Sequence, residues 1–234
     1  MMTVSEYIFD FLQKKGCQTV YMVSGSSAMW LTDALKRNEK LQAVCCQHEQ
    51  AAAMAADGVG RMTSVPGVAL VTIGPGATNT VTGVAGAFLD SSPMIVLSGQ
   101  ISSPIYRYQK ESRIRQKGTQ SLMLENMTAD ITKYFAVILD EKDVRYHLER
   151  AYYEATHGRK GPVWLDVPID IQNKKVPEVM EGFSVPEEKV PQTPIPEKEI
   201  AELLKNARKP LILAGYGVLS SHTKEDLRKF AEKY

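Results

Sequence analysis

Short apolar runs alternate with longer helical patterns through residues 1–172, and this alternation most constrains the fold. Alternating strands and helices predict a parallel sheet with helices on both faces. Strands that are apolar throughout fit this arrangement, because neither face of such a sheet meets water. We therefore expect an α/β fold, a three-layer α/β/α sandwich with a mainly parallel sheet. The expected strands cover residues 19–23, 41–46, 68–73, 94–98, 134–139 and 162–167.

The helical segments carry recognisable start and stop residues. Thr3 and Glu6 have the spacing of a capping box, and Gly16 is placed to end the helix that they begin. The polar, highly charged stretch 101–116 is expected to be a loop. The other expected helices cover residues 28–37, 49–61, 78–89, 121–129 and 142–156.

The composition changes after residue 172. Five prolines fall within 173–196 among charged residues, which predicts an extended linker. A helix (197–206), an apolar strand (211–214) and a helix (221–233) are expected to follow as a partial second α/β unit. The predicted organisation is therefore a domain at 1–172, a Pro-rich linker at 173–196 and the start of a truncated further domain at 197–234.

Charge and cysteine content exclude several functions. The 28 basic and 27 acidic residues leave a net charge of +1, which argues against a nucleic-acid partner. No apolar run reaches the length of a membrane span, so no membrane partner is expected. Cys17 and the adjacent Cys45 and Cys46 form no CxxC pair, which favours a reduced chain in the cytoplasm and no metal site of its own.

Three polar or glycine-rich segments directly follow expected strands: 24–28, 47–50 and 74–79. The carboxyl ends of strands in an open parallel sheet form the ligand-binding edge. Glu49 opens an alanine-rich helix there. It is either a charge that the helix dipole favours or a half-buried acid that needs a partner. Its neighbour His48 is more typical of a packing or hydrogen-bonding residue than of a base.

The glycine-rich turn at 74–79 also has two interpretations. It is either a tight turn for packing a helix on the sheet or a place where the chain closely approaches a ligand. It matches neither GxGxxG nor GxxxxGK[ST], and Pro75 lacks the N–H that a phosphate cradle would use. A dinucleotide-binding fold is therefore the weaker alternative.

Four motifs in order carry a family resemblance. They are CQHEQAAAMAADG at 46–58, TIGPGATN at 72–79, AFLDSSP with SGQ at 87–100, and GPVWLDVPID at 161–170. Residues 1–172 resemble the N-terminal, pyrimidine-binding (PYR) domain of thiamine-diphosphate-dependent enzymes of the acetolactate synthase type. Residues 197–234, which include ARKPLILAGYGV at 207–218, are similar to the first helix, strand and second helix of the central domain of that family.

The resemblance implies roles for individual residues. Glu49 stands where the family has the glutamate that hydrogen-bonds N1′ of the aminopyrimidine and so activates the cofactor. Gln120 aligns with a glutamine that faces the reacting centre, although Ser121 follows it where acetolactate synthases usually have Glu. The residues implied to contact the cofactor are Gly25, Glu49, Thr72, Pro75, Gly76 and Asn79.

The implied protein is a carboligase or 2-keto-acid decarboxylase that uses thiamine diphosphate. Its Mg²⁺ would be held by a domain with a Gly-Asp-Gly motif that this chain lacks, and FAD has no support in this chain. The substrates would be a small 2-keto acid and an aldehyde, keto or keto-sugar acceptor, and the assembly a homodimer or homotetramer. The departures at 24–28 and at Ser121 favour a surface-polysaccharide or modified-sugar pathway over branched-chain amino-acid synthesis.

Three hypotheses about the chain itself stay open at this point. It is a piece of a longer enzyme that is inactive alone, one subunit of a split two-chain enzyme, or a non-catalytic binding protein that keeps the fold. Glu49 distinguishes the last of these, because a binding protein would not need its carboxylate.

Overall fold

The structure is a computed structural model that describes residues 1–187 and 194–233. The chain divides into two compact units, Met1–Ser184 and Val185–Tyr234, and each is described by itself. The predicted linker at 173–196 includes 188–193, which lie outside the described residues.

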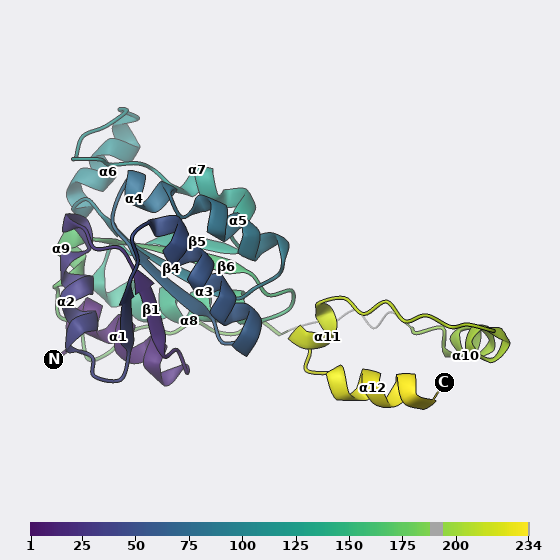
Figure 1. Cartoon of the computed structure of the whole chain (residues 1–234). Coiled ribbons are helices and arrows are strands. Elements are labelled where there is room, and N and C mark those ends of the chain that lie inside the picture. Colours follow the sequence, from purple (N-terminus) through teal and green to yellow (C-terminus); the bar gives the residue numbers. More distant parts are fainter. Residues whose placement is uncertain (188–193, 234) are drawn as a thin grey trace. The chain divides into compact units, whose positions relative to one another are not determined.

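The first unit contains a six-stranded sheet in which every neighbouring pair of strands is parallel (Figure 1). The order β2-β1-β3-β4-β6-β5 confirms the expected sheet class. The strands are β1 (Thr19–Met22), β2 (Gln42–Cys45), β3 (Gly67–Val71), β4 (Met94–Gln100), β5 (Tyr134–Val137) and β6 (Pro162–Pro168).

Helices connect these strands. The capping box is present as predicted: the Thr3 side chain accepts from the Glu6 backbone N–H, and the Glu6 carboxylate accepts from the Thr3 N–H. The helices are α1 (Val4–Lys14), α2 (Met29–Arg37), α3 (Glu49–Thr63), α4 (Pro75–Thr78), α5 (Val81–Leu89), α6 (Ser103–Ser112), α7 (Glu125–Thr128), α8 (Val144–Thr156) and α9 (Ile169–Gln172), with 3₁₀ turns at Ser26–Ala28, Ala129–Ile131 and Glu141–Asp143.

Two hydrophobic clusters cover the two faces of the sheet, as a three-layer sandwich requires. Val68 and Leu70 of β3 join the cluster formed with α1, α2 and α8. Ala69 and Val71 of the same strand join the cluster formed with α3 and α5. Side chains alternate between faces along a strand, so a strand that is apolar throughout is buried on both sides.

The order in which the chain adds strands to the sheet reverses beside β1, although all the strands stay parallel. From β1 it moves outward to β2 and then crosses back to β3 on the other side of β1. Ligands bind at such a switch point, outside the carboxyl ends of the strands. The segments that follow β1, β2 and β3 are therefore brought to one place.

Three local expectations are corrected. Residues Ser103–Ser112, expected to be a loop, form helix α6, because Tyr106 and Gln109 give it a buried side. Strand β2 is largely exposed because it lies at the edge of the sheet. The first residues of the predicted linker pack on the first unit, since the Phe183 ring contacts Tyr146 and Tyr153.

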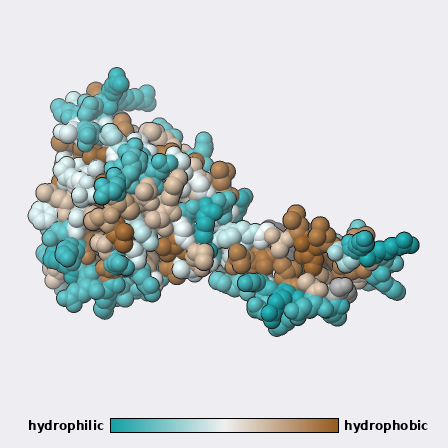
Figure 2. All heavy atoms as spheres, in the orientation of Figure 1, coloured by the Kyte–Doolittle hydropathy of each residue, from teal (hydrophilic) through white to brown (hydrophobic). Residues whose placement is uncertain are grey.

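The second unit holds three helices among its described residues: α10 (Glu197–Asn206), α11 (Gly217–Ser220) and α12 (Lys224–Lys233). The expected strand at 211–214 is not formed, and a strand needs a partner for its backbone that the described residues of this unit do not supply. Leu211 and Leu213 are 91% and 95% exposed. Figure 2 shows apolar residues gathered on the surface of this unit.

Candidate active site

The turns after β1 and β3 are in close contact at the switch point. A Cβ atom added to Gly25 would lie 2.4 Å from the Thr72 Cβ, and one added to Gly76 would lie 2.7 Å from the Thr72 Cγ2. Only glycine leaves room for this approach at both positions. The backbone of Gly25 is extended, so its requirement for glycine is steric rather than conformational.

Glu49 begins helix α3 beside the same turns. His48 caps this helix, because its Nδ1 accepts from the Gln50 backbone N–H at 3.1 Å. The predicted packing or hydrogen-bonding role of His48 is thus confirmed. Glu49 is half-buried, as its alanine-rich surroundings suggested. Its Oε2 accepts a hydrogen bond from the Asn79 side-chain amide at 2.9 Å.

The second oxygen of Glu49 faces the glycine turn. Oε1 lies 3.3 Å from where a Cβ atom of Gly76 would stand. Pro75 is the first residue of α4, a position in which its missing N–H costs nothing. The turn therefore presents a carboxylate oxygen beside backbone that carries no side chain.

Gln120 reaches this turn from a distant part of the chain. A Cβ atom on Gly74 would lie 2.3 Å from the Gln120 carbonyl oxygen, so the two backbones are in contact. Both residues have positive φ, +61° at Gly74 and 56° at Gln120. The predicted residues Gly25, Glu49, Thr72, Gly76, Asn79 and Gln120 thus come together through a chain of close contacts at one edge of the sheet.

One polar atom among these residues is buried without a partner. The Thr72 hydroxyl oxygen has no hydrogen-bond partner among the described residues. An orphaned hydroxyl of this kind costs about 1–3 kcal/mol unless a ligand or water satisfies it. The Glu49–Asn79 pair beside it supplies a carboxylate and an amide, which are groups that hydrogen-bond ring nitrogens and amino groups.

A buried acid that sequence reasoning did not single out as functional lies on β6. Asp166 of β6 accepts hydrogen bonds from Ser98, from Gln100 Nε2 at 3.0 Å and from Trp164 Nε1 at 3.2 Å. Burial raises its pKa to about 6, against the lowering effect of these bonds. The sequence did contain a signal, a lone acid within the apolar run 162–167.

Gln172 fixes the turn that carries Gly25. Its side-chain amide donates to the Ser27 carbonyl at 2.7 Å and to the Val167 carbonyl at 2.8 Å. The Ser27 carbonyl also packs against Gly99, where a Cβ atom would stand 2.1 Å away. This role could not be predicted from the sequence, because glutamine is usually a surface residue and nothing near Gln172 marks it as buried.

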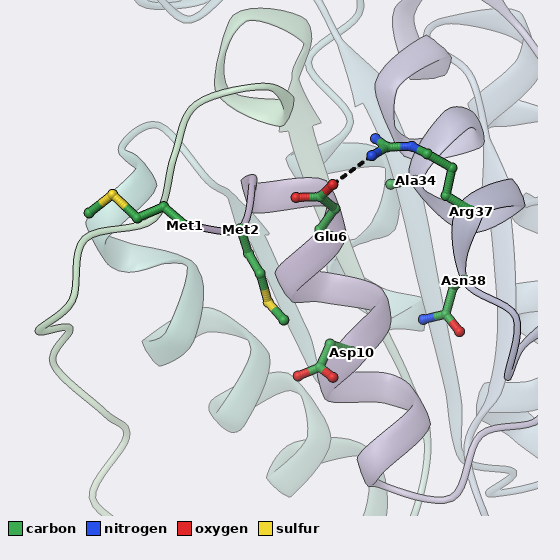
Figure 3. Close-up of a pocket in the computed structure, with 7 residues that line it drawn as sticks. All are labelled: Met1, Met2, Glu6, Asp10, Ala34, Arg37 and Asn38. Carbon is green, nitrogen blue, oxygen red and sulfur yellow. Dashed lines mark hydrogen bonds and ion pairs between the residues drawn. The ribbon is translucent and has the colours of Figure 1, made fainter.

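A surface pocket of about 480 Å³ lies between α1 and α2, where Arg37 pairs with Glu6 at 2.7 Å (Figure 3). Its lining contains none of the predicted site residues.

Within residues 1–187 and 194–233, no group of three or more His, Cys, Asp or Glu side chains is arranged to hold a metal ion. In the same ranges no helix has the length and hydropathy of a bilayer span.

Two models of known families match the sequence of this chain. The family model described as "Thiamine pyrophosphate enzyme, N-terminal TPP binding domain" matches residues 2–128. The model described as "Thiamine pyrophosphate enzyme, central domain" matches residues 198–234. The chain therefore belongs to the thiamine pyrophosphate (thiamine diphosphate) enzymes, and its first unit is an N-terminal cofactor-binding domain of that family.

Within this family the chain is of the acetolactate synthase type. It is 36% identical to the acetolactate synthase large subunit of Buchnera aphidicola over 236 residues, covering 98% of this chain and 40% of the relative. It is 34% identical to the large subunit of Lactococcus lactis (98% and 39%) and 32% identical to the chloroplastic acetolactate synthase of Arabidopsis thaliana (97% and 33%). The chain thus spans 33–40% of the length of these curated relatives.

Proposed function

We propose that this chain supplies the aminopyrimidine-binding half of a thiamine-diphosphate site for decarboxylation or carboligation of 2-keto acids. The observation that carries the proposal is the Glu49 carboxylate, fixed by Asn79 and placed beside Gly76 at the switch point. A carboxylate held in this way is a hydrogen-bond partner for a ring nitrogen that can be protonated.

The other residues complete the cradle. Gly25 and Gly76 let the turns after β1 and β3 pack against Thr72, and the Asn79 amide fixes the Glu49 carboxylate that would meet the ring. When bound, thiamine diphosphate supplies the electron sink that decarboxylation and carbon–carbon bond formation require. Glu49 would hold a proton at N1′ of the aminopyrimidine, and Gln120 would lie on the side where the acceptor enters.

The part of the site that binds the diphosphate and Mg²⁺ is proposed to come from another domain and another subunit. Mg²⁺ and the diphosphate would be held by a domain with a Gly-Asp-Gly motif, and the site would be completed by a second subunit in a homodimer or homotetramer. The acceptor would be an aldehyde, a ketone or a keto sugar. The changes at 24–28 and Ser121 favour a sugar-modifying pathway.

Titration of the 234-residue chain with thiamine diphosphate tests this function. Replacing Glu49 by Gln removes a charge-assisted hydrogen bond worth about 1.5–3 kcal/mol, so calorimetry should show affinity about tenfold weaker or more. The matched control is Glu39→Gln, which alters an exposed acid outside the site. The proposal is wrong if the parent chain does not bind, or if both variants bind as the parent does.

A further inference from the structure

Gln120 is held in backbone geometry that its own residue type does not favour. Its φ of 56° lies in the left-handed region, and its carbonyl oxygen rests against Gly74. Such a conformation persists only where the surrounding structure imposes it. The residues that impose it therefore decide where Gln120 stands relative to the glycine turn.

Gln109 of α6 holds the loop on both sides of Gln120, through residues 115 and 117 before it and Ser121 after it. Its side chain is buried and makes three hydrogen bonds. Oε1 accepts from the Lys117 backbone N–H at 3.0 Å and from the Ser121 hydroxyl at 2.6 Å. Nε2 donates to the Arg115 carbonyl at 3.2 Å. One side chain thus ties three points of the loop 115–121 to helix α6.

Gln100 holds the segment on the C-terminal side. It is the last residue of β4 and is fully buried. Its Nε2 donates to the Leu122 carbonyl at 3.2 Å and to Asp166, and its Oε1 accepts from the Ile101 N–H at 3.0 Å. The Ile101 side chain in turn lies 2.5 Å from where a Cβ atom of Gly118 would stand.

We propose that Gln109 and Gln100 are positioning residues that together set Gln120 over Gly74. Both act through hydrogen bonds to the backbone and to the Ser121 hydroxyl on either side of Gln120. This inference rests on the proposed function. If Gln120 lies where the acceptor enters, the two glutamines that place Gln120 also select the carbonyl acceptor that fits beside the cofactor. Ser121 belongs to the same hydrogen-bond network, since its hydroxyl donates to Gln109 Oε1 at 2.6 Å.

Nuclear magnetic resonance of the ligand-free 234-residue chain tests the positioning directly. The parent should show a nuclear Overhauser effect between Gly74 and Gln120. The variant Ser121→Ala removes one hydroxyl with little risk to folding, and Gln109→Met removes all three bonds at similar volume. Both should weaken or abolish that effect, and amide exchange in residues 115–121 should rise about tenfold or more. Glu111→Gln, which alters an exposed residue of α6, should change neither.

Adding thiamine diphosphate separates positioning from general damage. In the parent, the ligand should shift the amide resonances of both Asn79 and Gln120. In Gln109→Met the Asn79 response should persist at similar affinity while the Gln120 response is lost. Equal loss at both residues would show a merely structural role and overturn the inference, as would an unchanged Gly74–Gln120 contact in both variants. Absence of any Asn79 response in the parent would instead refute the proposed function, and the ligand-free contact test would still stand.

Discussion

The Asn79 side chain donates a hydrogen bond of 2.9 Å to Glu49 Oε2, although the two residues are thirty positions apart. Glu49 begins the helix after β2, and Asn79 ends the turn after β3. The bond satisfies one carboxylate oxygen and fixes the plane of the group. The other oxygen, Oε1, lies beside Gly76, 3.3 Å from where a Cβ atom of that residue would stand.

Asn79 should tolerate removal of its amide better than conversion to a carboxylate. Asn79→Ala loses one hydrogen bond, so thiamine diphosphate should bind to the 234-residue chain a few-fold more weakly. Asn79→Asp places two carboxylates against each other, and their repulsion should weaken binding further and lower the melting temperature. Calorimetric titration and thermal unfolding measure the two effects. Equal behaviour of the two variants would show that the Glu49–Asn79 contact does not form.

Gly25 and Gly76, the two glycines that contact Thr72, should not tolerate an added methyl group. Gly25→Ala and Gly76→Ala drive Cβ into Thr72, which should cost about 1–3 kcal/mol of unfolding free energy and weaken ligand binding. The matched control is Gly58→Ala within α3, where Cβ would meet no atom within 4 Å. That variant should gain about 0.5–1 kcal/mol, because alanine is the better helix former. Urea unfolding that ranks the three variants otherwise would refute the close packing.

Asp166 should make the stability of the chain fall as the pH rises from about 4 to about 6. Burial raises its folded-state pKa from the ordinary 3.8 to about 6, so in this window the folded chain keeps a proton that the unfolded chain has lost. The stabilising contribution is therefore complete below the window and lost above it. Its size is on the order of 3 kcal/mol, at about 1.4 kcal/mol per pKa unit.

The variant Asp166→Asn isolates this effect from that of other acids. Relative to the parent, its unfolding free energy in urea should improve between about pH 4.5 and about pH 7. Asp130→Asn, at an exposed position, should show no such relative change. If the difference between parent and Asp166→Asn were independent of pH, Asp166 would not titrate in the folded chain as its burial indicates.

The chain alone should bind thiamine and thiamine diphosphate about equally. The proposed contacts are all with the aminopyrimidine end, and the 234 residues contain no Gly-Asp-Gly. Affinities measured by calorimetry should agree within about threefold, with or without Mg²⁺. Pyruvate should not be consumed. Much tighter, Mg²⁺-dependent binding of the diphosphate form, or measurable turnover of pyruvate, would contradict this account.

The architecture of the first unit could be predicted from the sequence because a strand that is buried on both faces needs apolar residues at every position. Strands such as 68–73 were recognisable for that reason, and the capping residues Thr3 and Glu6 located the first helix. Strand order could not be read, since it depends on which crossover packs where. The edge position of β2 and its exposure therefore emerged only from the structure.

The candidate site was predicted in part. Glu49, Gly76 and Asn79 stood out because polar or small residues follow strands, and the family resemblance assigned them roles that remain predictions. The supporting residues did not stand out. Gln109 is buried and bonds the loop that follows its own helix, whereas Gln172 is buried and bonds the distant Ser27 carbonyl. No local pattern distinguishes either residue from an exposed glutamine. The strand expected at 211–214 failed because pairing needs a neighbouring strand.

The central claim is that Glu49 bonds to the aminopyrimidine ring, and the nitrogen resonance of bound cofactor measures it most directly. Thiamine diphosphate labelled with ¹⁵N at N1′ would be titrated into the 234-residue chain and into Glu49→Gln. With the parent, the N1′ signal should move from its free position in the direction of protonation, and with Glu49→Gln it should stay near the free position. An unshifted signal in the parent at saturation, or an equal shift in both proteins, would contradict the account.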